Sequence, residues 1–390
     1  MDALGLARLQ FAVTTSFHFL FVLLTLGLVT LVAVTQTRAT VTKNPVQWRM
    51  TRFWGRLYVV NYALGIATGI VMEFQFGLNW SGLAEVAGDV FGAPLATETL
   101  VAFFLESTFL GLWIFGWDRL NRWAHLALIW LTALTAYASV LWIMVANGFL
   151  QHPVGHVDDG GVLRLVDFGA LLTNPTFRVA FAHVFSAALT VGGVFVTGVS
   201  AYHLIKRTKE NEFFRSSLRL GVVTTALATP FLIGAGFGQF PVIGEFQPDK
   251  SAAAGTLGGI GLGLMILTGF TLFLASWLGL PLLLRDWVIR LRFPLYLMVL
   301  SIPLPFLAAI GGWLYRELGR QPWLVYGVLR TEDAMSPVSE SGMLTSFIAF
   351  TALFAVLAVA DWVLIARLAR RGPEPVDAPA TPVSPLVPAL

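Results

Sequence analysis

Nine long apolar stretches separated by short polar connections dominate the pattern of the sequence. They lie near 10–35, 53–78, 95–117, 124–149, 177–205, 217–240, 256–283, 293–315 and 343–367. A membrane-spanning helix needs about 20 such residues, and none of these stretches alternates as the strands of a barrel do. The pattern therefore predicts an all-α integral membrane protein, built as a bundle of nine transmembrane helices.

The positions of Lys and Arg predict the orientation of this bundle. The connections on one side carry 18 of the 25 basic residues: 38–56, 118–123, 206–219, 285–292 and 367–371. The other side carries seven: Arg8, Arg164, Arg178, Lys250, Arg316, Arg320 and Arg330. The positive-inside rule then places the N-terminus outside and the C-terminus in the cytoplasm.

Composition narrows the possible chemistry. Charged residues make up only 12% of the 390 residues against 56% hydrophobic ones, and the chain has no cysteine. Disulfides, thiolate catalysis and Cys-ligated zinc or iron–sulfur centres are therefore excluded, and the net charge of +3 is no sign of nucleic-acid binding. Histidines, methionines or carboxylates must hold any metal or cofactor. We expect one membrane domain over 1–371 and a disordered, Pro/Ala-rich cytoplasmic tail over 372–390.

Ionisable residues inside the apolar stretches need a reason, since each costs about 2.5–3.5 kcal/mol on insertion scales. The candidates are His18, Glu73, Glu98, Glu106, His125, His183 and His203. His18 and His183 fit either a buried histidine bonded to a neighbouring helix or an axial haem ligand. We expect His125, His203, His152 and His156 at the membrane interface or in solvent.

Glu98 and Glu106 share one predicted helix. In a regular α-helix they would lie about 80° apart around the axis and about 12 Å apart along it. Two carboxylates in one apolar helix favour a proton relay or a metal ligand, and the alternative is an interhelical hydrogen bond made by protonated carboxyls.

Long motifs give the chain a resemblance to a known family. They include Arg8-Leu9-Gln10-Phe11, His18-Phe19-Leu20-Phe21, Met72-Glu73-Phe74-Gln75-Phe76-Gly77, Phe103-Phe104-Leu105-Glu106-Ser107-Thr108, Val145-Ala146-Asn147-Gly148 and Gly319-Arg320-Gln321-Pro322-Trp323. With these runs the chain resembles subunit I of cytochrome bd oxidase, a membrane quinol oxidase. The resemblance covers nearly the whole chain and implies the same nine-helix topology.

The resemblance implies three haems in the membrane domain. His183 and Met265 would clamp a low-spin haem b that takes electrons from quinol. His18, Glu98 and Glu317 would jointly serve two high-spin haems, one b and one d, or a further haem b in place of d. O2 would bind at a high-spin iron, which keeps one position open.

The resemblance also assigns roles around these haems. Glu106, Ser107 and Asp118 would lie on the cytoplasmic proton route, and Trp313 would sit between the haems. Because Arg pairs bidentately with carboxylates, the candidates for holding haem propionates are Arg8 and Arg320. The family pairs with a subunit II-like membrane protein, to which a small single-helix subunit can be added, in the bacterial or archaeal cell membrane.

One region departs from the family. The outside connection that carries its quinol site is short here, running only from Pro241 to about Gly255. The motif that starts at Gln247 and includes Lys250 survives, but Ala254 and Gly255 replace the acidic residue expected after it. An arginine common two residues before the haem methionine is replaced by Gly263.

This departure leaves the electron donor open. Quinol could bind at a reduced or different site, with Lys250 and Gln247 as candidates, although a lone outside lysine is more often solvated. Another donor, such as a cytochrome c or a partner protein, could replace quinol, or a minimal chain could receive electrons through another subunit. A non-redox channel or transporter on the same scaffold is a remote alternative, since the whole set of haem ligands is present.

Overall fold

A computed structural model describes residues 2–284 and 287–374. Within these residues nine spans are long and apolar enough to cross a membrane, as the sequence predicts. They are α1 (Ala3–Thr42), α2 (Pro45–Asn79), α3 with the π-helix η1 and α4 (Ser81–Thr97, Glu98–Phe103, Phe104–Phe115), α5 (Arg122–Gln151), α7 (Pro175–Lys206), α8 with α9 (Asn211–Phe237, Gln239–Phe246), α10 (Lys250–Leu282), α12 with α13 (Arg292–Leu300, Leu304–Leu318) and α15 (Glu340–Arg371).

The helices extend beyond their apolar cores. Asn121 accepts from the backbone N–H groups of Trp123 and Ala124 and so caps α5, and Asn174 caps α7 by accepting from Thr176. Such caps satisfy the free N–H groups of the first turn. The segment 79–94, between two of the predicted apolar stretches, is largely helix α3, because hydropathy marks only the part of a helix that lies in hydrocarbon.

Proline divides one predicted helix. The stretch 293–315 forms two helices, α12 and α13, with a turn at residues 301–303. Pro303 has no N–H to donate and its ring clashes with the preceding turn, so the α-helical ladder stops there.

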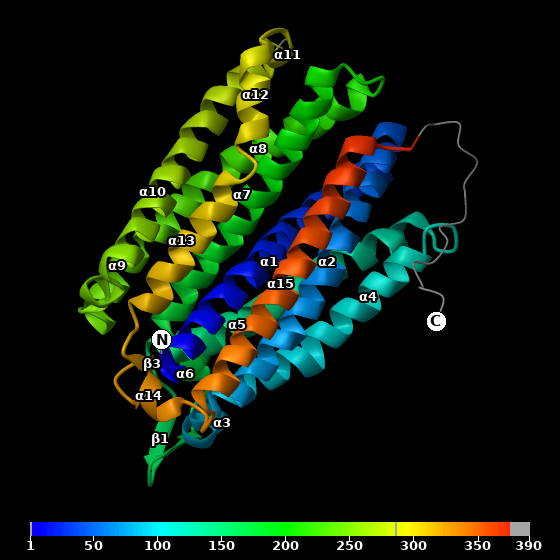
Figure 1. Ribbon diagram of the computed structural model, residues 1–390. Coiled ribbons are helices and arrows are strands. Elements are labelled where there is room, and N and C mark those ends of the chain that lie inside the picture. The colour runs from blue at the N-terminus through cyan, green and yellow to red at the C-terminus, as the bar shows by residue number, and fades with distance from the viewer. Residues whose placement is uncertain (1, 285–286, 375–390) are drawn as a thin grey trace.

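Short elements connect the spans. Strands β1 (His156–Asp159) and β2 (Val162–Leu165) form an antiparallel hairpin, followed by α6 (Phe168–Thr173). A second antiparallel pair, β3 (Trp323–Val325) and β4 (Leu329–Arg330), precedes α14 (Thr331–Ala334). These elements, α9 and the N-terminus lie at one end of the bundle, and α11 (Trp287–Arg290) lies at the other (Figure 1).

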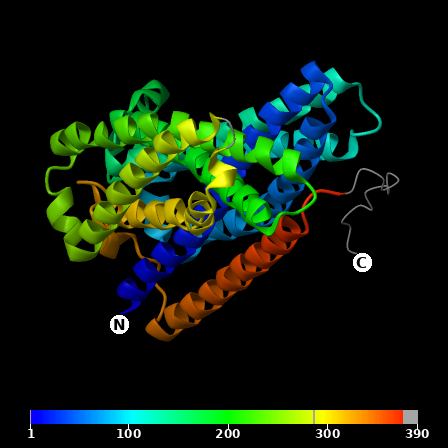
Figure 2. The same ribbon diagram turned by 90° about the horizontal axis from the view of Figure 1, so that it is seen from above.

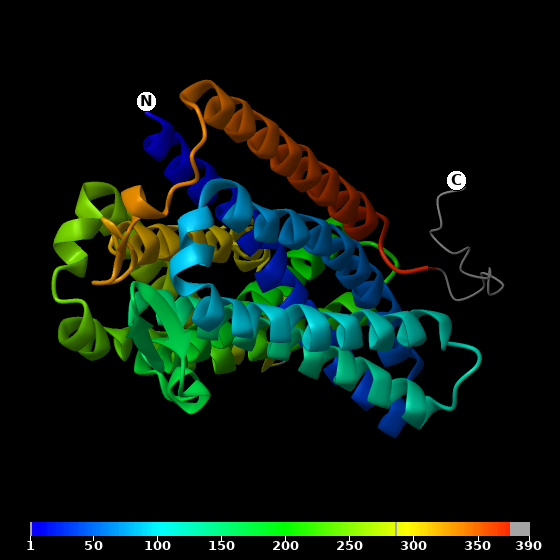
Figure 3. The ribbon, with the colours of Figure 1, turned by 90° about the horizontal axis from the view of Figure 1, so that it is seen from below.

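Helix α1 runs through the middle of the bundle and packs against α2, α5, α7, α13 and α15. Figures 2 and 3 show it between the α7–α8–α10–α13 group and the α2–α15 group. A Cβ on Gly192 of α7 would lie only 2.8 Å from the Cα of Gly27 on α1. Small residues at such crossings let helix backbones approach closely.

The predicted tail falls mostly outside the described residues, which end at Glu374. Glu374 is bound at the end of the bundle that carries most of the Lys and Arg residues, which is called the basic end below. Its carboxylate pairs with Arg56 at 2.6 Å, and its carbonyl accepts a hydrogen bond from Arg49. The disorder expected for 375–390 and the inside–outside orientation of the bundle remain predictions.

Candidate haem sites

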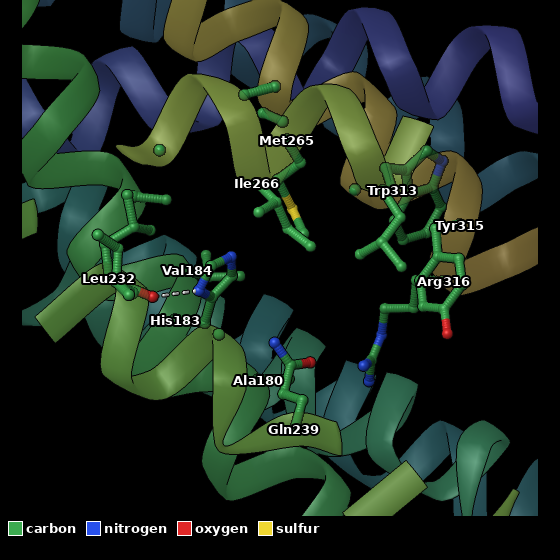
Figure 4. Close-up of a pocket in the computed structure, with 18 of the residues that line it drawn as sticks. Ala180, His183, Val184, Leu232, Gln239, Met265, Ile266, Trp313, Tyr315 and Arg316 are labelled. Atoms are coloured by element: carbon green, nitrogen blue, oxygen red, sulfur yellow. Dashed lines mark hydrogen bonds between the residues drawn. The ribbon is translucent and has the colours of Figure 1, made fainter. Parts of the chain in front are cut away.

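A cavity of about 170 Å³ lies among α7, α8, α10 and α13. Its walls are mainly apolar, and His183 of α7 and Met265 of α10 both line it (Figure 4). The sequence places these two residues on separate helices, and the fold brings them to one space.

The hydrogen bonding of His183 fixes its tautomer. Its Nδ1 lies 2.9 Å from the carbonyl oxygen of Leu232, and a carbonyl can only accept, so Nδ1 carries the proton. The lone pair is then on Nε2, which has no hydrogen-bond partner among the described residues. Metal-binding histidines are oriented in this way by an acceptor behind the ring. A Cβ at Gly236 would lie 3.1 Å from the ring, so this glycine makes room for it.

Met265 owes its position to a close crossing of α10 and α13. The backbones meet at Gly261 and Gly311, where a Cβ on Gly261 would lie 3.1 Å from the Cα of Gly311. One turn further along α10, the Met265 sulfur lies against Gly312, where any side chain would overlap it. A thioether opposite a neutral imidazole is the donor pair of a six-coordinate, electron-transferring haem.

Trp313 connects this cavity to α1. It lines the cavity, and its ring lies 6.2 Å from both Phe11 and Phe19, measured between centroids. Its buried Nε1 has no hydrogen-bond partner within the described chain. Trp313 therefore lies between the cavity and α1.

His18 on α1, like His183, is hydrogen-bonded through Nδ1 to an oxygen atom on a neighbouring helix. Its Nδ1 lies 3.0 Å from the hydroxyl oxygen of Thr68 on α2. Thr68 gives its own proton to the carbonyl of Gly65 at 2.8 Å, so it accepts from His18. The Nε2 atom of His18 therefore carries the lone pair and has no partner among the described residues.

A group of carboxylates lies near His18. A Cβ at Gly69 of α2 would lie 3.2 Å from the His18 ring, and Glu73 lies one turn further along the same helix. The hydroxyl of Thr99 lies 3.3 Å from Glu73 and 3.1 Å from Glu98, and Ser139 of α5 donates to Glu98. His18 and Glu98, far apart in sequence, thus reach one region of the bundle.

The helix that carries Glu98 and Glu106 is not regular, which corrects the angle expected between them. Residues Glu98–Phe103 form the π-helix η1, with i→i+5 hydrogen bonds. This wider turn changes the direction in which Glu98 points relative to Glu106. Isolated π-helical turns inside longer helices frequently mark functional positions.

Polar groups continue from Glu98 toward the basic end of the bundle. Glu106 is buried, with 5% of its surface exposed, and interacts electrostatically with Glu98. The hydroxyl oxygens of Tyr62 and Ser107 lie 3.4 Å apart. Asp118 lies beyond the end of α4 with an exposed side chain, where it meets water.

Glu317 is held by three donors. Asn147 and Gln151 donate to its Oε1 at 3.2 and 3.4 Å, and Arg320 pairs with its Oε2. A carboxylate accepts about four hydrogen bonds, so one acceptor position remains for a ligand role. Arg320 also donates to the carbonyl of Leu324 at 2.6 Å, while its Nε is buried without a partner. Arg8, the other candidate for propionates, is half-buried in α1.

Lys250 is not solvated, contrary to the more common behaviour of a lone outside lysine. Only 2% of it is exposed, and its Nζ donates to Gln151, Gln247 and the carbonyl of Arg316 at 2.8, 3.0 and 3.0 Å. An ammonium has three donors, and all three are used within the protein. Gln247 is also buried, and its Nε2 has no partner.

Two histidines expected at the interface or in solvent are buried instead, each 2% exposed. His125 is bonded through both ring nitrogens, to Gln36 at 2.9 Å and to the carbonyl of Trp113 at 2.8 Å. His203 donates to the carbonyl of Ala369 at 2.7 Å and stacks on Phe214. Both tie helices together. The other two, His152 and His156, are partly buried.

The sequence interpretation missed Arg316 as a site residue. It stands one position before Glu317 and counted only as an outside charge, yet its side chain lines the His183–Met265 cavity. Its Nε donates to Asn147 at 2.7 Å, and its Nη2 is buried without a partner. Nothing in the sequence indicates which side of α13 the guanidinium occupies.

These arrangements fit haem better than a metal ion held by protein alone. No group of three or more His, Asp or Glu residues suited to a metal ion occurs within the described residues. Haem needs only one or two protein ligands, because the porphyrin supplies the other four. An apolar cavity, neutral imidazoles with free Nε2 atoms and a buried, unpartnered guanidinium nitrogen are the features that a haem with carboxylate side chains would use.

Comparisons with known proteins agree with this chemistry. The model of the family described as cytochrome bd terminal oxidase subunit I matches residues 6–258 and 260–373. The chain is 37% identical to the cytochrome bd ubiquinol oxidase subunit 1 of Bacillus subtilis (strain 168), over 98% of this chain and 97% of that protein. It is 45% identical to the cytochrome bd-II ubiquinol oxidase subunit 1 of Escherichia coli (strain K12), over 65% of this chain but only 47% of that one.

The fold is similar as well. A chain of the bd oxidase from Geobacillus thermodenitrificans superposes with a TM-score of 0.89 at 24% identity, covering 95% of this chain and 99% of that one. This structural similarity shows a shared fold, and the family membership rests on the sequence matches. These matches confirm the resemblance inferred from the motifs. They give no support to the alternative of a non-redox channel or transporter. This multi-pass membrane protein belongs to the cytochrome bd terminal oxidase subunit I family, a family of haem-containing oxidoreductases.

Proposed function

We propose that the chain is the catalytic subunit of a cytochrome bd-type oxidase that reduces O2 to water with electrons from a quinol and protons from the cytoplasm. The observation that carries this proposal is the cavity in which His183 and Met265 meet, with the free Nε2 of His183 available to an iron. Haem, when bound, supplies one-electron transfer and, at an iron with an open position, a place for O2 to react.

The residues divide this work between two regions. His183 and Met265 would hold a low-spin haem b. His18, Glu98 and Glu317 would serve a high-spin haem b and a haem d, or a further haem b in its place. Trp313 packs between the cavity and α1 and would lie on the electron path between the two regions.

Carboxyl and hydroxyl groups would deliver the protons. Each O2 takes up four electrons and four protons to give two waters, and two quinols supply four electrons. Asp118 at the protein surface would take protons from water, the Ser107 hydroxyl and the Glu106 carboxyl would hold and pass them, and Glu98 would receive them near the oxygen site. With cytoplasmic uptake and outside release of quinol protons, the reaction would build a membrane potential without a pump.

Quinol is the donor that the relatives support, since those from Bacillus subtilis and Escherichia coli are named ubiquinol oxidases. The Bacillus alignment spans 455 positions against 390 residues here, so it places gaps in this chain. The family match is interrupted at residue 259, directly after the connection that is short. Gln247, with its unpartnered amide nitrogen, is the better remaining candidate for a quinol contact, because Lys250 has no donor to spare.

All three donors of Lys250 are used within the protein. This favours a second candidate function, a bd-like oxidase that receives its electrons from a cytochrome c or a partner protein. We further propose a subunit II-like partner, with room for a small single-helix subunit, in a bacterial or archaeal cell membrane, with the N-terminus outside. Exposed apolar side chains along α10, such as Leu257, Ile260 and Leu267, suit contact with lipid or with such a partner.

Oxygen uptake by the purified oxidase tests the donor. We expect uptake with a soluble quinol and none with reduced cytochrome c, and a Gln247→Ala variant should raise the KM for quinol with little change in kcat. Uptake with reduced cytochrome c and none with quinol would reject the quinol proposal in favour of the second candidate.

A further inference from the structure

An excess of buried positive charge lies at one end of the His183–Met265 cavity. Lys250 lies near enough to Arg316, Arg320 and Glu317 to interact with their charges, and the same holds for Arg316 with Glu317 and Arg320. Within the described residues Glu317 is the one carboxylate that interacts in this way with both Lys250 and Arg316. Three cations therefore face one anion, and buried charges without partners are strongly disfavoured.

The spare hydrogen-bonding capacity in this cluster belongs to Arg316. Lys250 uses all three of its donors within the protein, and one of them holds the backbone carbonyl of Arg316 at 3.0 Å. Asn147 accepts from the Nε of Arg316 at 2.7 Å. With the base of the side chain held in this way, the Nη2 atom is buried and without a partner.

Arg316 lies beside the cavity in which the haem ligands meet. Figure 4 shows its guanidinium pointing to the same space as the His183 ring and the Met265 sulfur, with Gln239 nearby. A guanidinium is the side chain best suited to bind a carboxylate in two parallel hydrogen bonds. A group with two carboxylates would balance the two excess positive charges.

We propose that Arg316, braced by Lys250, anchors a propionate carboxylate of the haem held by His183 and Met265 and raises the midpoint potential of that haem. This inference rests on the proposed function, since it needs haem in the cavity. A fixed positive charge stabilises the reduced, more negative form, and the low dielectric of the interior strengthens the effect. Lys250 acts here as a positioning residue, not as a quinol contact.

Potentiometric titration of the low-spin haem in the purified oxidase complex tests the proposal. Arg316→Gln should shift the midpoint to lower potential while the low-spin spectrum stays, because His183 and Met265 are untouched. Arg316→Lys, which keeps the charge, should stay close to the wild-type midpoint. Lys250→Gln should shift the midpoint in the same direction as Arg316→Gln, but less, since its amino group is turned away onto Gln151 and Gln247.

Arg330→Gln is the matched control, because Arg330 is an exposed arginine paired with Glu332. Its midpoint should equal that of the wild type. Loss of the haem from Arg316→Gln but not from Arg316→Lys would also support the anchor. A wild-type midpoint in Arg316→Gln, or an equal shift in Arg316→Lys, would overturn it. A wild-type complex without any low-spin haem would instead reject the proposed function itself.

Discussion

His183 and His125 lie in equally apolar helices but have different surroundings. The most apolar windows of α7 and α5 have the same mean hydropathy, 1.9. His183 donates from Nδ1 to a carbonyl and leaves Nε2 facing a cavity. His125 has both nitrogens bonded, with Gln36 on one side and the Trp113 carbonyl on the other. The first ring can bind an iron, and the second cannot.

The same division separates the other two histidines of the apolar stretches. His18 resembles His183, because Thr68 fixes its Nδ1 proton and leaves Nε2 free. His203 donates from Nε2 to the Ala369 carbonyl, and its Nδ1 has no partner but is completely buried, with the ring stacked on Phe214. The comparison teaches that a free ring nitrogen with open space beside it, and not the hydropathy of the helix, separates a possible ligand such as His183 from a buried cross-link such as His203.

The largest effect is expected from His183→Ala. Without its imidazole the cavity has no strong iron ligand, so the low-spin haem should be lost and quinol-dependent oxygen uptake should fall by at least about 100-fold, the scale of losing an essential catalytic group. Haem content and oxygen uptake of the purified complex measure both. His125→Ala is the control and should keep the full haem content. Equal haem in His183→Ala and the wild type would break the comparison.

A change in spin state is expected from Met265→Leu. Leucine has a similar volume, so packing against Gly312 should survive, but it offers no ligand. The haem should stay bound through His183 and become five-coordinate and high-spin, which the absorbance spectrum and electron paramagnetic resonance report. A low-spin spectrum like that of the wild type would show that another residue is the second ligand.

A smaller effect is expected from Thr68→Val, which removes the acceptor behind His18 and keeps the side-chain volume. Loss of such an outer partner costs about 10–100-fold in metal affinity. The purified variant should therefore lose high-spin haem faster on dilution into detergent, while the low-spin haem at His183 remains unchanged. Thr37→Val, on the same bundle but away from His18, serves as the control. Identical loss rates in the two variants would contradict the role of Thr68.

The smallest effect, on stability alone, is expected from His125→Phe. The aromatic ring keeps the stacking on Trp113, which lies at 5.6 Å between centroids, but two hydrogen bonds vanish and buried partners are left unsatisfied. Each such loss costs about 1–3 kcal/mol. Thermal unfolding in detergent should begin at a lower temperature with haem content unchanged. Loss of haem at normal stability would place His125 among the ligands after all.

The sequence was sufficient for the nine spans, because about 20 apolar residues in a row have few other uses. The family resemblance pointed to His18, His183 and Met265 as haem ligands, and the fold brings His183 and Met265 to one cavity. The sequence did not show that Lys250 turns inward or that Arg316 faces the cavity, since both depend on the crossing of α10 and α13. The wider turn at Glu98 was also hidden, because a π-helix has no distinct residue pattern.

The most direct test is the reduced-minus-oxidised absorbance spectrum of the purified wild-type complex, taken together with that of His183→Ala. The structure predicts a low-spin haem b signal in the wild type that is absent from the variant, while the signals of the other haems persist. A colourless wild-type complex, or an undiminished low-spin signal in His183→Ala, would contradict the assignment of the cavity as a haem site.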